Sequence, residues 1–504
     1  MVRSKFGRKL NRNLPYASAN TKNYENFPAW TMSIEEQFKQ LATNGIIAHQ
    51  FYCDENEVIK RGIGIIKKYV RENPKKAVQI AVEARGKSFI RSINILTLAF
   101  AAAHDLNAFK SNFNVIIRTP RDIVQFIDIM RSTRGLGRGI KKAINDWLSW
   151  KLNTFYAIKY KTQLRDAIRL AHPKFEDEEK VALGDYIMDN PERLENCLKM
   201  HKQIDAFEAV KRMSPVTNEI EILQAMRNHR LDWNTIKGAI KPTPAIWKGF
   251  AENMSMIALV QNLASIERHA GADYAIHIVR NRVTIDNLQK GKVFPFKLVQ
   301  AWFKVKSPDV KREIGKVIDS YSLKYDFSPL GKVTVAPDVS GSMNWGDGSF
   351  HNRYSHNPIQ IAAIFSGILC GAMKDSTLLA WDTLVHTSDD LFPHLAEWKT
   401  PTKIMERIMN IGGGGTYMEL PVKYMINHDI ETDTFILITD SEEWGAGWLG
   451  DWKKYKRDHV NARAVLIRVD LYPTRPFSGD DCEQYDITQI YGFNDNVFRL
   501  LLER

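Results

Sequence analysis

The feature of this sequence that most constrains the fold is a change in the spacing of its apolar residues near Lys332. Before that point, from about residue 32 to 320, apolar side chains recur at three- and four-residue steps, which is the spacing of amphipathic helices. One such series comprises Val58, Ile59, Ile63, Ile66 and Val70. Two-residue alternation is not sustained in this stretch, so the pattern predicts a front part built from helices.

Proline-containing breaks divide the helical region into short segments. They fall at Asn73-Pro74, Thr119-Pro120, His172-Pro173 and Pro242-Thr243-Pro244. Proline lacks a backbone N–H and restricts the residue before it, so helices end at such positions. Short amphipathic helices in series bury their apolar faces against their neighbours, as in HEAT-like helical repeats. We therefore predict a mainly α, solenoid-like module over residues 1–330, with the basic segment 1–25 as an N-terminal arm.

Past Lys332 the pattern alternates between short apolar runs and helical segments. The predicted strands are Val333 to Ala336, Ser376 to Trp381, Thr434 to Thr439 and Ala464 to Val469. The predicted helices are Pro358 to Met373, Thr402 to Asn410, Met418 to Asn427 and Trp448 to His459. Such alternation predicts a parallel sheet with helices on both faces. Residues 331–504 should therefore form a Rossmann-like α/β domain, with ligand sites at the carboxyl ends of its strands.

Net charge is distributed unevenly between these two parts. Residues 331–504 contain 16 Lys and Arg against 24 Asp and Glu, a net charge of −8, and residues 1–330 carry +20. A domain this basic attracts polyanions and can neutralise several phosphates at once. Charge alone leaves open the alternative of basic residues scattered over a solvated surface.

The cysteine spacing and the length of the apolar stretches indicate in which cellular compartment the protein is expected. Cys53, Cys197, Cys370 and Cys482 form no CxxC pair, so neither a disulfide framework nor a zinc cluster is indicated, and a reducing compartment is expected. The longest apolar stretch, Ile93 to Ala103, has 11 residues, whereas a bilayer-spanning helix needs roughly 20. The basic N-terminus has no apolar core of a secretory signal peptide behind it. We expect a cytoplasmic protein that does not bind membranes.

Three motifs of the α/β part fall at the ends of predicted elements. Asp338-Val339-Ser340-Gly341-Ser342 leaves the first strand, a tetraglycine and Thr416 precede a helix, and Asp440 ends the third strand. Carboxylates and hydroxyls that converge there are hard oxygen donors, which suit a small cation such as Mg²⁺. DxSxS alone is a weak motif, since such a loop can simply cap a helix. The tetraglycine lacks the Lys-Ser/Thr of a P-loop, so nucleotide binding is not indicated.

Together, these motifs resemble the metal-ion-dependent adhesion site of von Willebrand A domains. The residues that the resemblance implies as ligands of one divalent metal ion, most readily Mg²⁺, are Asp338, Ser340, Ser342, Thr416 and Asp440. It also implies an open coordination position that an acidic side chain of a protein partner fills. A catalytic metal would need a general base and a water-holding pocket. Nearby acids, which we interpret as rim charges, are Asp347, Glu442 and Glu443.

The most concentrated basic run surrounds a glycine-rich turn. It comprises Arg131, Arg134, Arg138, Lys141 and Lys142, with no acid between them. The turn opens a predicted helix whose inward face holds Ile140, Ile144 and Trp147, so both lysines lie on the outer face. Free backbone N–H groups at a helix start, together with clustered Arg and Lys, form a phosphate site. A solvated charged face is the alternative reading of the run by itself.

Three segments resemble the TROVE-domain proteins, the Ro autoantigen family. They are Arg134-Gly-Leu-Gly-Arg138-Gly-Ile-Lys-Lys-Ala-Ile-Asn-Asp-Trp, Leu170 to Lys174 after Lys159-Tyr160-Lys161, and Pro242 to Trp247 followed by Asn253-Met254 and Ala258 to Leu263. A TROVE module followed by a von Willebrand A domain is the family's architecture, so the resemblance covers nearly the whole chain. Gln261 stands where the family usually has Arg, and residues 26–30 match only loosely.

The resemblance implies a ring of helical repeats that binds RNA. Single-stranded 3′ ends of misfolded RNA enter the central hole in this family, and small structured Y RNAs bind the outer surface. The residues that match the RNA-binding face by position are Arg134, Arg138, Lys141, Lys142, Arg169 and His172. In bacterial relatives a bound RNA can tether the exoribonuclease polynucleotide phosphorylase, which the resemblance extends to this chain as a partner.

These observations predict a non-enzymatic RNA-binding scaffold or RNA quality-control factor. The alternative is an A-domain adhesion or assembly module whose helices form a protein-binding solenoid. A metal nuclease is disfavoured, because the sequence offers no paired catalytic carboxylates on a basic surface. Co-purifying nucleic acid would favour the first function over the second.

Overall fold

The computed structural model describes residues 19–23, 26–44, 55–87, 90–293, 295–344, 358–373, 375–393, 399–440, 447–469, 474–491 and 496–502. Contacts divide the chain into two compact units. Unit 1 comprises residues 1–62 and 315–504, and unit 2 comprises residues 63–314. The predicted basic arm, residues 1–25, lies outside the described residues except for residues 19–23. No helix of the described chain is both long and apolar enough to cross a membrane.

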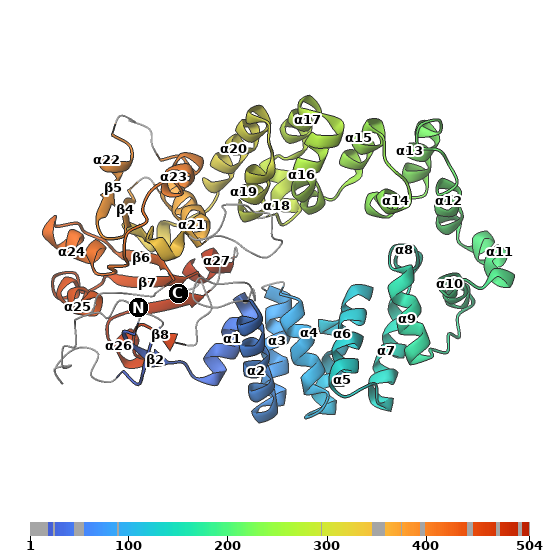
Figure 1. Ribbon diagram of the computed structural model, residues 1–504, viewed down its shortest axis with the longest axis horizontal. Helices are drawn as coiled ribbons and strands as arrows, with labels where there is room; N and C mark the ends of the chain where they lie inside the picture. The colour runs from blue at the N-terminus through green and yellow to red at the C-terminus, as the bar shows by residue number, and fades with distance from the viewer. Residues whose placement is uncertain are drawn as a thin grey trace, which may run out of the picture. The chain divides into compact units, whose positions relative to one another are not determined.

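Unit 2 consists of helices that follow one another along the chain (Figure 1). They are α2 (Glu55–Glu72), α3 (Pro74–Lys87), α4 (Ser92–Ala101), α5 (Leu106–Ile116), α6 (Pro120–Thr133), α7 (Arg138–Lys151), α8 (Thr154–Lys159), α9 (Lys161–Ala171), α10 (Glu178–Met188), α11 (Pro191–Met200), α12 (Lys202–Val210), α13 (Glu219–Asn228), α14 (Trp233–Ala239), α15 (Pro244–Asn253), α16 (Met256–Ala270), α17 (Ala272–Arg282), α18 (Ile285–Lys290), α19 (Pro295–Lys304) and α20 (Pro308–Ser322). The first and last of these cross the unit boundaries. Each helix packs mainly against helices near it in sequence, such as α3 against α4 and α5. The predicted helical-repeat architecture is confirmed.

The predicted proline breaks are the places where helices begin or end. Pro74, Pro120 and Pro244 occupy the first positions of α3, α6 and α15, where the missing N–H costs nothing. Thr119 caps α6, because its side chain accepts a hydrogen bond from the backbone N–H of Asp122. At the fourth break, His172 ends α9 in the left-handed conformation, with a φ of 53°.

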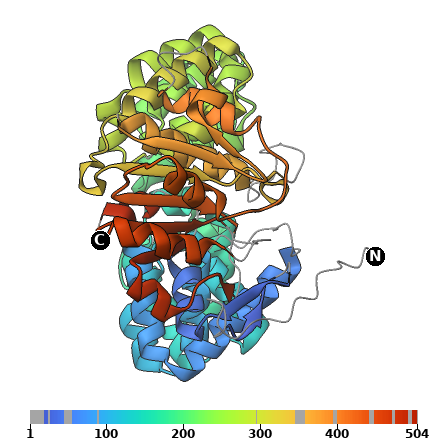
Figure 2. The same cartoon turned by 90° about the vertical axis from the view of Figure 1, so that its left-hand side faces the viewer.

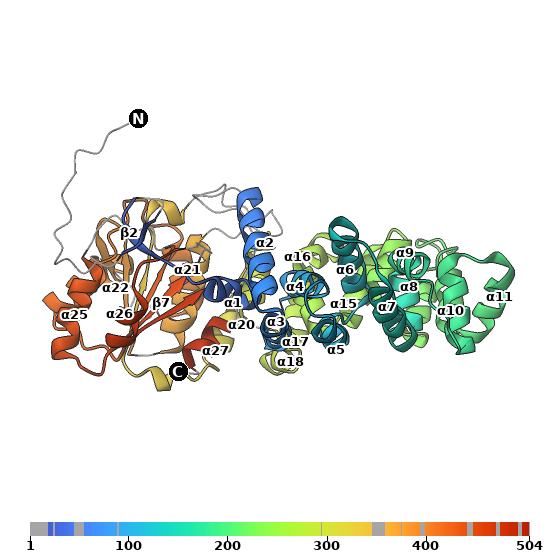
Figure 3. The ribbon, with the colours of Figure 1, turned by 90° about the horizontal axis from the view of Figure 1, so that it is seen from below.

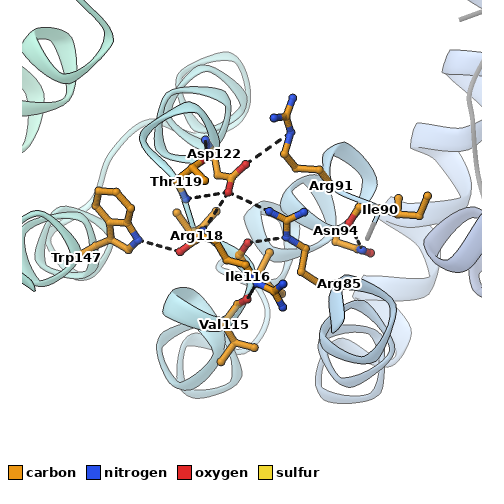
Figure 4. Close-up of polar contacts among 11 residues, drawn as sticks. Arg85, Ile90, Arg91, Asn94, Val115, Ile116, Arg118, Thr119, Asp122 and Trp147 are labelled. Atoms are coloured by element: carbon orange, nitrogen blue, oxygen red, sulfur yellow. Dashed lines mark hydrogen bonds and ion pairs between the residues drawn. The ribbon is translucent and has the colours of Figure 1, made fainter. Parts of the chain in front are cut away.

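A buried carboxylate ties α3, α4 and α6 together (Figure 4). Asp122 is fully buried, and its Oδ2 accepts a hydrogen bond from Arg85 Nη2 at 3.1 Å. The same oxygen accepts the backbone N–H groups of Arg118 and Thr119, each at 3.0 Å. Arg91 Nε lies 3.6 Å from the other oxygen, Oδ1. The contacts therefore bind the cap of α6 to the side chains of two earlier helical segments.

Two side-chain bonds to carbonyl groups extend this packing at the end of α5. Arg85 Nε donates to the carbonyl of Ile116 at 3.2 Å, and the indole N–H of Trp147 donates to the carbonyl of Ile117 at 2.8 Å. These carbonyls lie at the end of the helix, where the last carbonyl groups have no N–H partner within the helix. Trp147 thereby fixes α7 against the helices that precede it.

Unit 1 contains a six-stranded sheet with the strand order β5-β4-β3-β6-β7-β9. Its strands are β3 (Val333–Pro337), β4 (Thr377–Trp381), β5 (Val385–Thr387), β6 (Thr434–Thr439), β7 (Arg463–Arg468) and β9 (Ile487–Tyr491). All neighbours are parallel except β4 and β5. The predicted α/β domain with a parallel core is confirmed. The edge strands β5 and β9 were not predicted, because β5 is short and β9 carries polar residues.

Helices cover both faces of this sheet. They are α21 (Pro358–Ala372), α22 (Ser388–Leu391), α23 (Pro401–Ile408), α24 (Leu420–Asn427), α25 (Trp448–Asp458), α26 (Gly479–Gln484) and α27 (Asn496–Leu502). Helix α21 lies on one face, and α24 and α25 lie on the other (Figures 1 and 3). The second face holds a core of Trp381, Phe435, Trp448 and Trp452.

An N-terminal segment joins unit 1 through a second, three-stranded sheet (Figure 2). Its strands are β1 (Thr21–Lys22), β2 (Pro28–Thr31) and β8 (Thr474–Arg475), in the antiparallel order β1-β2-β8. Trp30 is buried and pairs with Arg475 across the strands. Arg475 Nη1 also contacts Glu36 Oε1 at 2.9 Å, on helix α1 (Ile34–Asn44). By contacts, then, the start of the chain groups with the α/β domain.

Candidate metal and nucleic-acid sites

The five predicted metal ligands lie at the carboxyl edge of the six-stranded sheet. Asp338 directly follows β3 and Asp440 directly follows β6, and these strands are neighbours. Their register pairs Pro337 with Ile438, so Asp338 aligns with Thr439 and Asp440 follows one residue later, close enough for the two carboxylates to repel each other. All five residues are buried, and the most exposed of them, Ser342, is 8% exposed.

Hydrogen bonds orient the Asp338 carboxylate within its loop. Its Oδ1 accepts the Ser340 backbone N–H at 2.9 Å, and its Oδ2 accepts the Thr439 hydroxyl at 2.6 Å. The hydroxyl oxygens of Ser340 and Ser342 lie 3.2 Å apart. Burial raises the pKa of Asp338 well above that of an ordinary carboxyl group, and the adjacent Asp440 carboxylate raises it further. Two buried carboxylates beside hydroxyls are an all-oxygen donor set, which fits a hard divalent cation.

The glycine-rich loop packs directly on the loop that carries Asp338. Gly413 N–H donates to the carbonyl of Val339, and Gly341 N–H donates to the carbonyl of Gly414, both at 2.9 Å. A Cβ at Gly412 would lie 1.9 Å from the Val339 carbonyl oxygen, and its φ is 88°. Only glycine tolerates that approach and conformation. The close packing holds the loop leading to Thr416 against the DxSxS loop.

Asp382 is a site residue that the sequence reasoning missed. It follows β4 and is 6% exposed. Its Oδ2 accepts Gly414 N–H at 3.2 Å, and its Oδ1 accepts Leu384 N–H at 3.0 Å and lies 3.3 Å from His386 Nε2. Asp382 therefore anchors the glycine-rich loop. The available signal was an acid directly after a predicted strand, as for Asp440. The rim charges predicted at residues 347, 442 and 443 lie outside the described residues.

Four of the six predicted RNA-binding residues line one groove of unit 2, which we call the α7–α10 groove. These four are Arg138, Lys141, Lys142 and His172, and the groove has a volume of about 760 Å³. Its walls also hold the basic residues Lys174 and Lys180 and the acidic residues Asp146, Glu176 and Asp177. The sequence thus indicated the basic wall of this groove but not its acidic side.

Local structure explains how these residues reach the groove. Gly135 has a φ of 78°, which makes the turn into α7, and Arg138 is the first residue of that helix. The side chain of Asn145 donates to the carbonyl of Ala171 at 3.0 Å. This bond fixes the end of α9 against α7 and so brings His172 to the groove.

The three basic side chains of α7 in this groove differ from neighbouring cations in their ion pairing with the described residues. Within the described chain, Arg138, Lys141 and Lys142 form no ion pair. On the adjacent helix α9, by contrast, Lys161 Nζ lies 2.6 Å from Asp189 Oδ1. Arg165 also pairs with Asp189. A cation without a carboxylate partner keeps its full attraction for an anionic ligand.

The other two predicted residues lie away from the groove walls. Arg134 Nη1 donates to the carbonyl of Ala102 at 3.0 Å, at the end of α4. Arg169 is exposed in the last turn of α9 and does not line the α7–α10 groove. Helical periodicity alone could not show that His172 lines the groove and Arg169 does not. The reason is that the left-handed backbone at His172 changes the direction of the chain after α9.

Two protein-family models match the chain, and both agree with this architecture. The TROVE domain matches residues 53–313, which is more than half of the chain, and the Ro60 vWA domain matches residues 332–503. The chain belongs to the TROVE-domain family. Residues 332–503 of this TROVE-domain protein accordingly form a von Willebrand A-type domain.

This TROVE-domain protein is similar to two relatives named RNA-binding protein RO60. The relative from Caenorhabditis elegans is 22% identical over 469 residues, which cover 77% of this chain and 71% of the relative. The relative from Deinococcus radiodurans is 20% identical over 502 residues, which cover 92% and 91%. The crystal structure of the Deinococcus radiodurans RO (RSR) protein matches with a TM-score of 0.67 at 16% identity, over 93% of this chain and 99% of that one. At this identity the structural match shows the shared fold.

Proposed function

We propose that this TROVE-domain protein is a non-enzymatic RNA-binding scaffold that acts in RNA quality control. Its ligands would be small non-coding, Y-like RNA and the single-stranded 3′ ends of misfolded RNA. The observation that carries the proposal is the α7–α10 groove, whose wall presents Arg138, Lys141 and Lys142, which form no ion pair with any acid that the structure describes. The printed names of the two relatives support it.

The chemistry of the groove suits RNA through two kinds of contact. Cations and the free N–H groups at the start of α7 bind phosphate oxygens and position the strand. Asp146, Glu176 and Asp177 on the walls repel phosphates but accept hydrogen bonds from base amino groups. The groove therefore favours a strand whose base edges are accessible, which single-stranded RNA offers and an A-form duplex does not.

Charge reversal in the groove tests this function. Arg138→Glu with Lys141→Glu should weaken binding broadly across RNA sequences, because phosphate contacts carry no sequence information. For the wild type, about five phosphate contacts at roughly 0.7 released counterions each predict a log–log salt slope of about −3 to −4. The measurement is fluorescence anisotropy of labelled single-stranded RNA at several salt concentrations.

A matched control separates a local effect from a change in net charge. Lys241→Glu with Lys290→Glu reverses two exposed cations of unit 2 outside the groove, and should bind RNA nearly as the wild type does. A folded groove variant that binds RNA as tightly as the control would contradict the proposal. Absorbance of the purified protein offers an independent check, since an assembly module with a protein-binding solenoid would carry no nucleic acid.

We propose further that the A domain holds one divalent cation, most readily Mg²⁺, and uses it to dock a partner. Asp338, Ser340, Ser342, Thr416 and Asp440 would hold the ion directly or through water. When bound, the ion supplies a positive centre with an open position for an acidic side chain of a protein. Polynucleotide phosphorylase, tethered by the bound RNA, is the exoribonuclease partner that the family resemblance implies, and a cytoplasmic location accords with such RNA substrates.

A further inference from the structure

A second groove of unit 2 lies between α2 and α4, and we call it the α2–α4 groove. It has a volume of about 460 Å³ and is lined by Gly64, Lys67, Lys68, Arg71, Phe100 and His104. Among the described residues, its lining includes three cations and no acid, whereas the α7–α10 groove has acidic residues on its walls. Charge alone therefore makes this groove the more purely anion-attracting of the two.

Helix α2 presents its cations on one side because its other side is buried. Ile66, Tyr69 and Val70 pack into the core, and Lys67, Lys68 and Arg71 lie within about one helical turn on the exposed side. Gly64 lies one turn earlier, and a Cβ there would meet no atom within 4 Å. The absent side chain leaves the groove open along the helix. Among described residues, the three cations form no ion pair.

An aromatic ring lies beside these cations. Lys67 Nζ lies 5.3 Å from the centroid of the Phe100 ring, and Phe100 is partly exposed. His104, also exposed, adds a second planar ring to the lining. Clustered cations beside exposed rings are the combination with which proteins bind single-stranded nucleic acid, holding phosphates electrostatically while bases stack. An acidic peptide would use the cations but not the rings.

One hydrogen bond links this groove to the start of the other. Arg134 Nη1 donates to the carbonyl of Ala102, which lies between Phe100 and His104 in the chain. Arg134 lies in the turn between α6 and α7, shortly before Arg138, the first residue of α7. The start of α5 also packs on α7, since a Cβ at Gly139 would lie 3.5 Å from Leu106, the first residue of α5. The two grooves therefore adjoin at Arg134.

We propose that a single RNA strand runs from the α7–α10 groove past Arg134 into the α2–α4 groove. Lys67, Lys68 and Arg71 bind its phosphates there, and an unstacked base lies against Phe100. This inference rests on the proposed RNA-binding function and adds a second contact region to it. It assigns Arg134 the position between the two grooves, which explains why this residue lies on neither set of walls.

The length of the RNA provides the test, because a short strand can occupy only one groove. Labelled uridine oligonucleotides of about 4 and about 16 nucleotides, the range of single-strand binding folds, are titrated against the full-length protein by anisotropy. The wild type should bind the longer strand more tightly. Lys67→Glu with Lys68→Glu should reduce affinity for the longer strand at least about tenfold and leave affinity for the shorter strand within about twofold.

Two further variants show whether the effect belongs to the groove. Lys241→Glu with Lys290→Glu makes the same charge change elsewhere in unit 2 and should keep the full preference for the longer strand. Phe100→Leu should lose part of that preference and Phe100→Tyr should keep it, because tyrosine retains a stacking ring. Circular dichroism confirms that each variant is folded.

The outcomes separate this inference from the proposed function. A Lys67→Glu, Lys68→Glu variant that keeps the wild-type preference for the longer strand overturns the inference and leaves RNA binding in the α7–α10 groove intact. Polyglutamate that binds the wild type but not this variant, without displacing RNA, assigns the groove to a protein ligand and also overturns it. If the wild type binds neither oligonucleotide, both the proposed function and this inference are wrong.

Discussion

At the scale of single residues, Asp338 shows why a buried carboxylate at a strand end indicates a ligand site. It is fully buried, lies beside the Asp440 carboxylate, and has a raised pKa for both reasons. A structural carboxylate of a protein core is usually paired with a cation. Here the neighbouring groups given by the structure are hydroxyls, a backbone N–H and a second acid. A divalent cation would offset both the desolvation and the repulsion.

Metal binding can be tested through stability. If the site takes Mg²⁺, the A domain should gain about 2.7 kcal/mol of unfolding free energy at an ion concentration 100 times the dissociation constant. Asp338→Asn should abolish that gain, because it removes a charged ligand. Calorimetry with Mg²⁺ and with a chelator measures both.

The control for this prediction is Asp458→Asn, an exposed acid of the same unit, which should keep the response to Mg²⁺. RNA affinity should be the same with Mg²⁺ and with chelator, since the proposed RNA contacts lie in unit 2. A wild-type melting temperature that ignores millimolar Mg²⁺ would show that the site takes no such ion. RNA affinity lost on chelation would make the ion part of the RNA site.

At the scale of elements, the helices of unit 2 depend on polar contacts at their ends as well as on apolar faces. Asp122 completes the capping box of α6 with Thr119 and simultaneously binds Arg85 of α3, and both acidic and basic side chains are almost entirely buried. Burial lowers the pKa of Arg85, while Asp122 acts in the opposite direction. A single carboxylate thus belongs to the capping box of α6 and is the partner of a buried cation, so its loss should disturb several helices together.

Removing that carboxylate should destabilise unit 2 strongly. Asp122→Asn leaves the buried guanidinium of Arg85 without its countercharge, which costs about 3–5 kcal/mol in comparable cases. Asp309→Asn removes the partner of Arg312 in an exposed pair and should cost about 0–1 kcal/mol. Urea unfolding followed by circular dichroism compares the two. Equal losses would show that burial does not determine the strength of the Asp122 contacts.

At the scale of the whole chain, the N-terminal segment and the α/β domain are far apart in sequence but joined in structure. Strand β2 pairs with β8, and Glu36 contacts Arg475. Trp30 is buried in this region. Main-chain pairing and a buried tryptophan both join the N-terminal segment to the α/β domain. That domain should therefore need residues 28–36 for its full stability.

Truncation tests this dependence. Deleting residues 1–32 from the full chain should lower the melting temperature of the A domain, because it removes β2 and its buried tryptophan. Trp30→Ala alone should cost about 3–5 kcal/mol, as large aromatic truncations in cores do. Deleting residues 1–18 is the matched control and should have little effect. An unchanged melting temperature after the longer deletion would show that the β2–β8 pairing contributes nothing to stability.

The sequence by itself determined the features that depend on neighbouring residues. Periodicity within single elements predicts the helices before Lys332 and the alternating strands and helices after it. It also places the acids Asp338 and Asp440 at strand ends. The basic run from Arg138 to Lys142 was visible for the same reason, since one helical turn places these side chains together. Only tertiary structure decided which of the predicted residues share a groove.

The features that the sequence did not predict depend on contacts between segments that are distant in the chain. No periodicity within a single element indicates such contacts. Asp382 became a site residue only when β4 aligned beside β3 and Gly414 came within hydrogen-bond distance. Lys67 and Phe100 line one groove although the whole of α3 separates them in sequence, because the fold brings Lys67 Nζ to 5.3 Å from the Phe100 ring centroid. The pairing of β2 with β8 joins residues from opposite ends of the chain, and its strands are too short to produce a recognisable alternation.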